Sequence, residues 1–298
     1  MTEITRRASI RKALGGAGVL ALACGSGVLT RDPLAWASLL ALPAAAKPPS
    51  SVVGGLQIGC MTWSFRDLAL AEALKSIAEI GFSTAELWSG HLDPFKASDD
   101  ELIRWKTRFA NAGVNLTSYF VDVRKDSSDK QISRCFEAGR RLGVNILSGN
   151  LTKALLPRID QACQEHKMYV GLHNEVYNPP LPSEVGSALD YVEVFQKTSH
   201  WVGATLDVGH LYAAGDDPVA FIRAHFNRIV SIHLKDERGG ARTTDYPFGK
   251  GPTPLGPILH ALQSLQFKGS ANIEWGVENV DPATGVSDAL GFVRRALA

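Results

Sequence analysis

Cysteine is scarce in this chain, with four among 298 residues, and no two of them form a Cys-x-x-Cys pair. Cys24 lies in an N-terminal leader, so the body of the chain holds Cys60, Cys135 and Cys163. An odd number of cysteines without paired spacing argues against a disulfide framework. Buried structural thiols are the simpler interpretation.

A strong excess of one charge is also missing. The formal net charge is +1, and removing the basic leader, with its five basic and two acidic residues, leaves a body of about −2. A near-neutral body has no electrostatic drive toward nucleic acid, so we expect no nucleic-acid partner. Neither GxGxxG nor GxxxxGK[ST] follows the first predicted strand, which disfavours a nucleotide-binding open sheet.

The leader, residues 1–46, has the features of an export signal. Arg6 and Arg7 precede a weakly hydrophobic Gly/Ala-rich stretch at 13–29, and small residues at 44–46 offer a cleavage site. This pattern resembles a twin-arginine signal. We therefore expect the twin-arginine export machinery as a partner and a periplasmic mature protein. The apolar stretch is short for a membrane span, which needs about 20 residues. A lipoprotein anchored through Cys24 is the alternative.

Residues 47–55 read as a linker, and short β-rich runs alternate with amphipathic helical stretches over 56–298. The predicted strands are 56–63, 83–88, 116–122, 144–149, 168–175, 203–208, 229–235 and 270–275. The predicted helices are 67–80, 99–112, 128–142, 152–166, 183–198, 217–225, 254–266 and 284–297. Eight such units with right-handed crossovers predict a single (β/α)8 TIM barrel, and an open doubly wound sheet is the alternative.

Unusual polar residues stand at the ends of the later strands. His173 and Glu175 share one face of their strand, as do His233 and Lys235 of theirs, because strand side chains alternate. Asp207, Glu274 and, on an earlier strand, Glu86 are further carboxylates at such ends. Chemistry in this fold sits at the C-terminal strand ends. Buried carboxylates and imidazoles converging there are costly unless they are paired or bind a metal.

The motifs LDVGH at 206–210, SIHLKD at 231–236, PFGKG at 247–251 and ANIEW at 271–275 occur in this order. Together they resemble the xylose isomerase-like TIM barrel superfamily, and with the leader its exported sugar phosphate isomerase/epimerase branch, which is related to AP endonuclease family 2. The resemblance covers roughly residues 56–298. It implies one divalent metal ion (Mn, Co, Mg or Zn) held by Asp207, His233 and Glu274. The family usually places a Glu at the end of the fifth strand. Here the aligned residue is His173, which becomes the fourth ligand, with Glu175 as the other candidate.

The expected reaction is metal-dependent isomerisation or epimerisation of a sugar or polyol, by proton transfer next to a carbonyl through a cis-enediolate. The candidate catalytic residues are Glu274, Glu175 and Lys235. The candidate substrate-binding residues are Glu86, His210, Trp63 and Lys250, with His210 placed in a loop and Lys250 in a loop that closes over the barrel mouth. No arginine cluster or phosphate loop is visible, which favours a non-phosphorylated carbohydrate.

Three alternatives stay open. The same enediolate chemistry serves a dehydratase or lyase acting on a keto sugar or keto-glycoside. A barrel with a decayed site would be a non-catalytic sugar-binding module. An endonuclease IV-like phosphodiesterase is disfavoured, because its metal cluster needs further histidines that strands 83–88 and 116–122 lack. The sequence is also compatible with a homo-oligomer.

Overall fold

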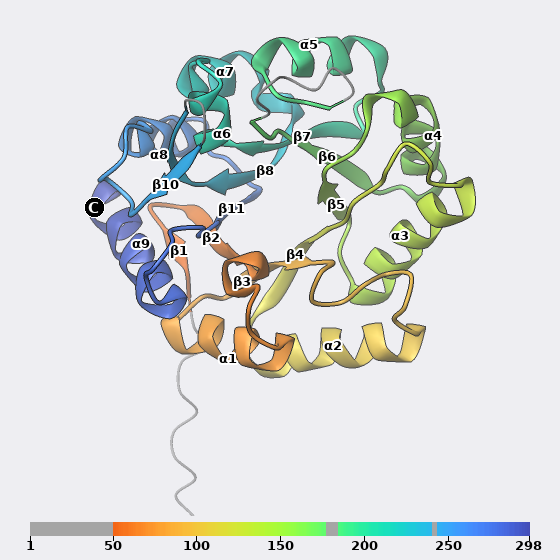
Figure 1. The fold of residues 1–298 in the computed structure, drawn as a ribbon, viewed down its shortest axis with the longest axis horizontal. Coiled ribbons are helices and arrows are strands. Elements are labelled where there is room, and N and C mark those ends of the chain that lie inside the picture. The colour runs from red at the N-terminus through yellow and green to blue at the C-terminus, as the bar shows by residue number, and fades with distance from the viewer. Residues whose placement is uncertain (1–49, 177–183, 240–242) are drawn as a thin grey trace, which may run out of the picture. The chain divides into compact units, whose positions relative to one another are not determined.

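The parallel strands form a closed barrel, with helices on its outside (Figure 1). The computed structural model describes residues 50–176, 184–239 and 243–298. The predicted export signal at 1–46 and the first residues of the predicted linker lie outside these ranges, so the signal stays a prediction.

Eight parallel strands make the barrel. They are β2 (Leu56–Met61), β3 (Thr84–Trp88), β4 (Asn115–Phe120), β5 (Ile146–Gly149), β6 (Tyr169–His173), β7 (Val202–Asp207), β8 (Ile229–Leu234) and β11 (Ser270–Ile273). Their order is β2-β11-β8-β7-β6-β5-β4-β3, and β2 also pairs with β3. This last pairing closes the sheet, so the predicted barrel is confirmed and the open sheet is wrong.

Amphipathic helices cover the barrel. They are α1 (Leu70–Ile80), α2 (Asp99–Asn111), α3 (Asp129–Leu142), α4 (Leu156–His166), α5 (Ala188–Lys197), α7 (Pro218–His225), α8 (Leu255–Ser264) and α9 (Pro282–Ala296). Short 3-10 turns add η1 (Thr62–Phe65), η2 (Lys153–Leu155) and η3 (Phe226–Arg228).

Helix α3 shows why these segments are helical. Ser128 and Gln131 form a reciprocal capping box at its start, which satisfies free N–H groups of the first turn. Gly143 ends it with φ +83°, a left-handed conformation that glycine adopts without steric cost. Between these ends, Ile132 and Phe136 are buried at helical spacing. The local signals therefore agree with the packing.

Four short elements depart from the predicted pattern. Strand β1 (Val52–Val53) pairs antiparallel with β2, so the structured chain begins before Leu56. Helix α6 (Val208–Ala213) follows β7 directly. After β8, β9 (Asp236–Arg238) and β10 (Thr244–Tyr246) form an antiparallel pair. Elements of two to six residues are too short to show a hydrophobic period, which is why pattern analysis missed them.

The three cysteines of the body are buried and free, as expected for structural thiols. Burial raises the pKa of the Cys60 thiol to about 12, so this thiol stays protonated and unreactive. Within the described ranges, none of the helices combines the length and the apolar character that a membrane crossing requires.

Candidate metal centre at the barrel mouth

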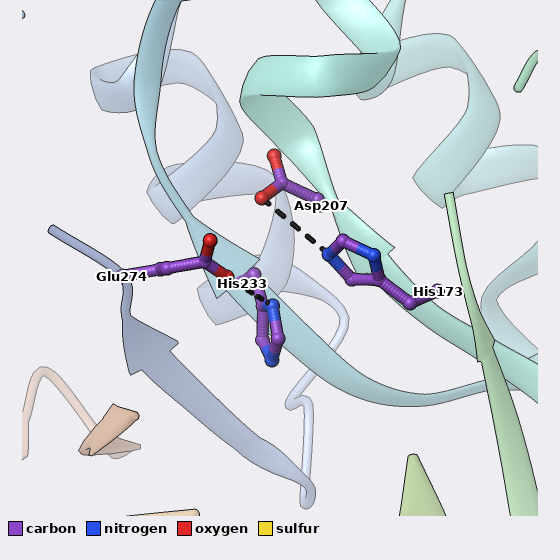
Figure 2. A group of neighbouring side chains, drawn as sticks. All are labelled: His173, Asp207, His233 and Glu274. Atoms are coloured by element: carbon purple, nitrogen blue, oxygen red, sulfur yellow. Dashed lines mark ion pairs between the residues drawn. The ribbon is translucent and has the colours of Figure 1, made fainter. Parts of the chain in front are cut away.

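Four buried side chains from neighbouring strands converge at the C-terminal end of the barrel (Figure 2). His173 ends β6, Asp207 ends β7, His233 lies in β8 and Glu274 directly follows β11. One nitrogen or carboxylate oxygen of each lies within 4.8 Å of the others. Since β6, β7, β8 and β11 are consecutive in the barrel, the alternation of strand side chains turns these four residues to one point.

His173 is oriented by an amide. Its Nδ1 lies 3.1 Å from the Oδ1 atom of Asn150, an oxygen that can only accept, so Nδ1–H is the donor. The Nε2 atom then carries a lone pair, has no hydrogen-bond partner, and faces Asp207 Oδ2 at 3.8 Å. Asp207 Oδ2 is also buried without a hydrogen-bond partner. Two buried electron-rich atoms that face each other are suited to share a cation.

His233 is held by two carboxylates. Its Nε2 lies 2.6 Å from Glu86 Oε1 and its Nδ1 lies 2.7 Å from Glu274 Oε2. Burial alone lowers the pKa of His233, but the two carboxylates raise it to about 10. The Nδ1 contact is close but lacks hydrogen-bond geometry. A carboxylate that orients one ring nitrogen while the other points into the cluster is the usual arrangement around a metal-binding histidine.

The donor set of this cluster fits a divalent cation. Two imidazole nitrogens and two carboxylates combine the ligands that Zn²⁺, Co²⁺ and Mn²⁺ accept, and Mg²⁺ accepts the carboxylate oxygens. Three of the four residues offer a buried atom without a hydrogen-bond partner: His173 Nε2, Asp207 Oδ2 and His233 Nδ1. The structure therefore brings together the four predicted ligands around a point where a cation fits, with His173 at the end of β6.

Beside the cluster runs a line of close contacts. The Nε2 atom of His210 lies 3.1 Å from Glu175 Oε1 and 3.2 Å from Lys235 Nζ, and Lys235 Nζ lies 2.7 Å from Glu274 Oε1. Burial alone lowers the pKa of His210, but Asp207, Glu175 and Glu237 help raise it to about 9. The line thus connects two carboxylates through an imidazole and an ammonium group.

His210 lies in α6 rather than in the predicted loop. Asp207 caps this helix, since its Oδ1 accepts the backbone N–H of His210 at 2.8 Å. Gly209 is needed here because a Cβ at this position would lie 2.8 Å from the carbonyl oxygen of Lys235. The DVGH motif therefore combines a ligand, a helix cap and a close approach to β8, and these together aim the His210 ring.

A cavity of about 400 Å³ opens above the cluster. Of the predicted residues, Trp63, His173, Glu175, His210, Lys235 and Glu274 line it. It is also lined by Met61, Trp88, Phe120, Asp122, Asn150, Thr243 and Asp245. Most of these side chains are polar, and Trp63, Trp88 and Phe120 add aromatic surface. Such a lining suits a small polar molecule.

Two predicted substrate contacts lie elsewhere. Glu86 is completely buried below the cavity, where it accepts hydrogen bonds from Ser118 and Ser148. It therefore orients His233 and does not line the cavity. Lys250 is exposed and is not among the residues that line the cavity. Its loop is fixed from below, because the Asp236 carboxylate accepts the N–H groups of Gly249, Gly251 and Thr253.

Sequence reasoning missed several residues of the site, and three of them place a polar side chain beside the predicted ones. Glu237, fully buried, lies 2.5 Å from His210 Nδ1. Glu237 follows His233 and Lys235 at a spacing of two residues, so the alternation of strand side chains could have predicted its place at the site. Asn150 follows β5 with the parity of Ser148, a weaker signal. Asp245 reaches the cavity from the β9–β10 pair, and no periodic pattern marks that pair.

Comparison with known proteins identifies the family of this chain. The family model described as xylose isomerase-like TIM barrel matches residues 74–296, and the chain belongs to this family. The L-ribulose-5-phosphate 3-epimerase UlaE of Escherichia coli K12 is 26% identical over 209 residues, which are 69% of this chain. The matched region spans 66% of that relative's length, slightly less than two thirds.

Solved structures show the same fold. The structure of D-psicose 3-epimerase in the presence of D-fructose has a TM-score of 0.65 at 15% identity, covering 81% of this chain and 99% of that one. The structure of 3-keto-D-glucoside 4-epimerase from E. coli has a TM-score of 0.63 at 16% identity, covering 80% and 99%. At these identities the likeness establishes the barrel fold alone.

Proposed function

We propose that this chain is a divalent-metal-dependent isomerase or epimerase of a non-phosphorylated keto sugar. The observation that carries the proposal is the joint presence of the His173–Asp207–His233–Glu274 cluster and the Glu175–His210–Lys235–Glu274 line at the base of one cavity. Relatives named as epimerases of sugars or sugar phosphates support this choice of reaction.

The four cluster residues would hold the ion. When bound, a divalent ion supplies Lewis-acid stabilisation of negative charge on the oxygens beside a substrate carbonyl. Asn150 and Glu86 fix the rings of His173 and His233 through Nδ1 and Nε2 respectively, which leaves the other nitrogen of each ring to the cluster. Such partners lock each imidazole in one tautomer and orientation.

Two carboxylates are placed to move the proton. Glu175 lines the cavity, lies outside the metal cluster, and keeps 34% of its side chain exposed. Glu274 lines the same cavity at the other end of the contact line. One carboxylate removes the proton next to the carbonyl, leaving an enediolate. Return of a proton to the same carbon from the other face epimerises it, and return to the neighbouring carbon isomerises the sugar.

Lys235 and His210 complete the site. The Lys235 ammonium group pairs with Glu274 and lines the cavity, so its charge favours negative charge on a substrate oxygen. His210 lies between Glu175 and Lys235. Its Nε2 can therefore share a proton with either residue during turnover.

The charge of the cavity favours a neutral substrate. In the described part of the chain, Lys235 is the one cationic side chain apart from histidine that lines it, and Glu274 already pairs with it. The acidic groups Asp122, Glu175 and Asp245 line the same walls. These carboxylates would repel a phosphate dianion at the walls of the cavity away from the metal cluster. The proposed substrate therefore lacks the phosphate group that is part of the name of the related L-ribulose-5-phosphate 3-epimerase.

We also propose that the protein works in the periplasm. The support is the Arg6–Arg7 pair and the apolar stretch that follows it. Twin-arginine export carries folded proteins, so a metal installed in the cytoplasm would travel with the barrel. Retention of the protein in the cytoplasm when both arginines are replaced by lysine would support this route, and unchanged export would contradict it.

The direct test is exchange of solvent deuterium into keto sugars in the presence of Mn²⁺, Co²⁺ or Mg²⁺. In D2O we expect deuterium at a carbon next to the carbonyl, seen by mass spectrometry as the mass increase of a single H-to-D replacement. In ordinary water the product should have the mass of the substrate, which separates isomerisation or epimerisation from loss of water. Glu175→Gln and Glu274→Gln should each slow exchange by at least 100-fold, since a general base contributes about 10²–10⁴-fold. Glu193→Gln, on the exposed side of α5, is the control. Absence of exchange from every keto sugar would refute the proposal.

A further inference from the structure

A second cavity adjoins the site. Its volume is about 480 Å³, and it is lined by Thr243, Thr244, Asp245, Gly276, Val277 and Glu278. Thr243 and Asp245 line the first cavity as well, so the two spaces meet at these residues. Each is within the range of about 300–1,000 Å³ that is typical of ligand pockets. The joined space exceeds what one sugar ring over the metal cluster requires.

The lining of the second cavity indicates what binds there. Two threonine hydroxyls, two carboxylates and the backbone of Gly276 offer hydrogen-bond donors and acceptors, while Val277 is the one apolar side chain among the described residues that line it. Hydroxyl groups both donate and accept, so they pair with such a surface. Asp245 and Glu278 would repel a phosphate or carboxylate substituent. A hydroxyl-rich neutral group fits better than an anion or a hydrocarbon.

The junction between the two cavities is closely built. A Cβ at Gly276 would overlap Asp245 Oδ2 and would lie 3.4 Å from Cη2 of Trp63. A side chain at position 276 would therefore displace the Asp245 carboxylate from its place beside Gly276. Asp245 is partly buried, and burial with the nearby carboxylates raises its pKa to about 6 despite the opposing charge of Lys235. Near neutral pH this carboxyl group can accept or donate a hydrogen bond to a hydroxyl.

From this arrangement we propose that the second cavity binds a further sugar unit of the substrate, linked to the ring that lies over the metal cluster. Asp245 and Trp63 contact the linkage region between the two units. The inference rests on the proposed function, because it assigns the metal cavity to a keto sugar. It makes the substrate a keto-disaccharide or a similar glycoside rather than a free keto-monosaccharide.

The experiment compares D-fructose with the keto-disaccharides turanose, lactulose and isomaltulose, which attach a second ring at three different positions. Binding to the Mn²⁺-loaded full chain is measured by calorimetry, and deuterium exchange is measured in parallel. We expect at least one disaccharide to bind ten-fold or more tightly than fructose. Equal or weaker binding of all three would overturn the subsite.

Two variants locate the preference. Thr244→Trp and Glu278→Trp place bulk in the second cavity from exposed positions in different segments, and each should reduce the disaccharide-to-fructose affinity ratio to within two-fold of unity. Thr107→Trp, exposed on α2, is the matched control and should keep the ratio. An unchanged ratio in both cavity variants would also overturn the subsite.

The two readouts separate the two proposals. Tight disaccharide binding without deuterium exchange would refute the proposed reaction and still support the subsite. Exchange with equal affinity for fructose and the disaccharides would support the reaction and refute the subsite.

Discussion

The Nδ1 atom of His210 lies 2.5 Å from the Oε2 atom of Glu237, and the carboxylate of Glu237 has no exposed surface. The other ring nitrogen, Nε2, lies beside Glu175 and Lys235 at the cavity. A buried carboxylate on one nitrogen sets the ring orientation and favours the charged form of the ring. We therefore predict that Glu237 positions the His210 ring and acts through it.

Replacing Glu237 with Gln should lower kcat by about 10- to 100-fold, the range expected when an orienting partner is lost. KM and metal content should change by less than three-fold, because Glu237 lies outside the predicted ligand set. Steady-state kinetics and metal analysis measure this split. Glu237→Asp should recover part of kcat. Loss of metal along with activity would instead indicate that Glu237 is a ligand.

Asp207→Asn tests the metal centre without removing the cap of α6, since Asn caps helices as well as Asp does. We expect metal content to fall from about one ion per chain to below one tenth. Metal should also stop raising the melting temperature, an effect worth about 2.7 kcal/mol when free metal is 100 times its Kd. Asp122→Asn, at the same cavity but outside the cluster, should keep its metal. Full occupancy in Asp207→Asn would exclude this cluster as the site.

The cluster was predictable because strand geometry is regular. Side chains of β6, β7, β8 and β11 alternate with a period of two, so parity alone places His173, Asp207 and His233 on one inner face. Glu274 lies one residue beyond β11, two residues after Asn272, and so points to the same inner face as Asn272 does. Polar residues in otherwise apolar strands were the visible signal. The barrel itself followed from eight repeats of strand and helix.

The walls of the cavity were less predictable. Asp245 belongs to a three-residue strand whose partner is equally short, and such pairing depends on tertiary contacts rather than on pattern. The glycine-rich loop around Lys250 suggested a segment that brings this lysine to the substrate. The hydrogen bonds to Asp236 instead hold the loop in place, and Lys250 is exposed to solvent. The role of Glu86 depended on Ser118 and Ser148 of β4 and β5, whose contacts with it are not visible in sequence.

His173→Glu should change metal preference. The wild-type cluster offers two nitrogens, which favour Zn²⁺ or Co²⁺, while a third carboxylate favours Mn²⁺ and Mg²⁺. We expect the ratio of Zn²⁺ to Mg²⁺ affinity to fall by at least ten-fold, measured by competition with a chromogenic chelator. His260→Glu, exposed on α8, should leave the ratio unchanged. An unchanged ratio in His173→Glu would mean that residue 173 does not ligate the metal.

Asp245→Asn should change how stability depends on pH. The folded-state pKa of Asp245 is raised from 3.8 to about 6, first by burial and further by Glu237 and Glu274. Between pH 4 and pH 6 the folded protein therefore holds this proton more tightly than the unfolded chain does, and the contribution of Asp245 to stability falls as pH rises through this window. The full loss is about 2–3 kcal/mol, since one pKa unit corresponds to about 1.4 kcal/mol. Asn does not titrate. From pH 4 to pH 6, the unfolding free energy of the wild type should therefore fall by about 2–3 kcal/mol relative to that of Asp245→Asn. Urea unfolding at several pH values measures it, and parallel curves for the two proteins would show that Asp245 is not a perturbed acid at the junction of the cavities.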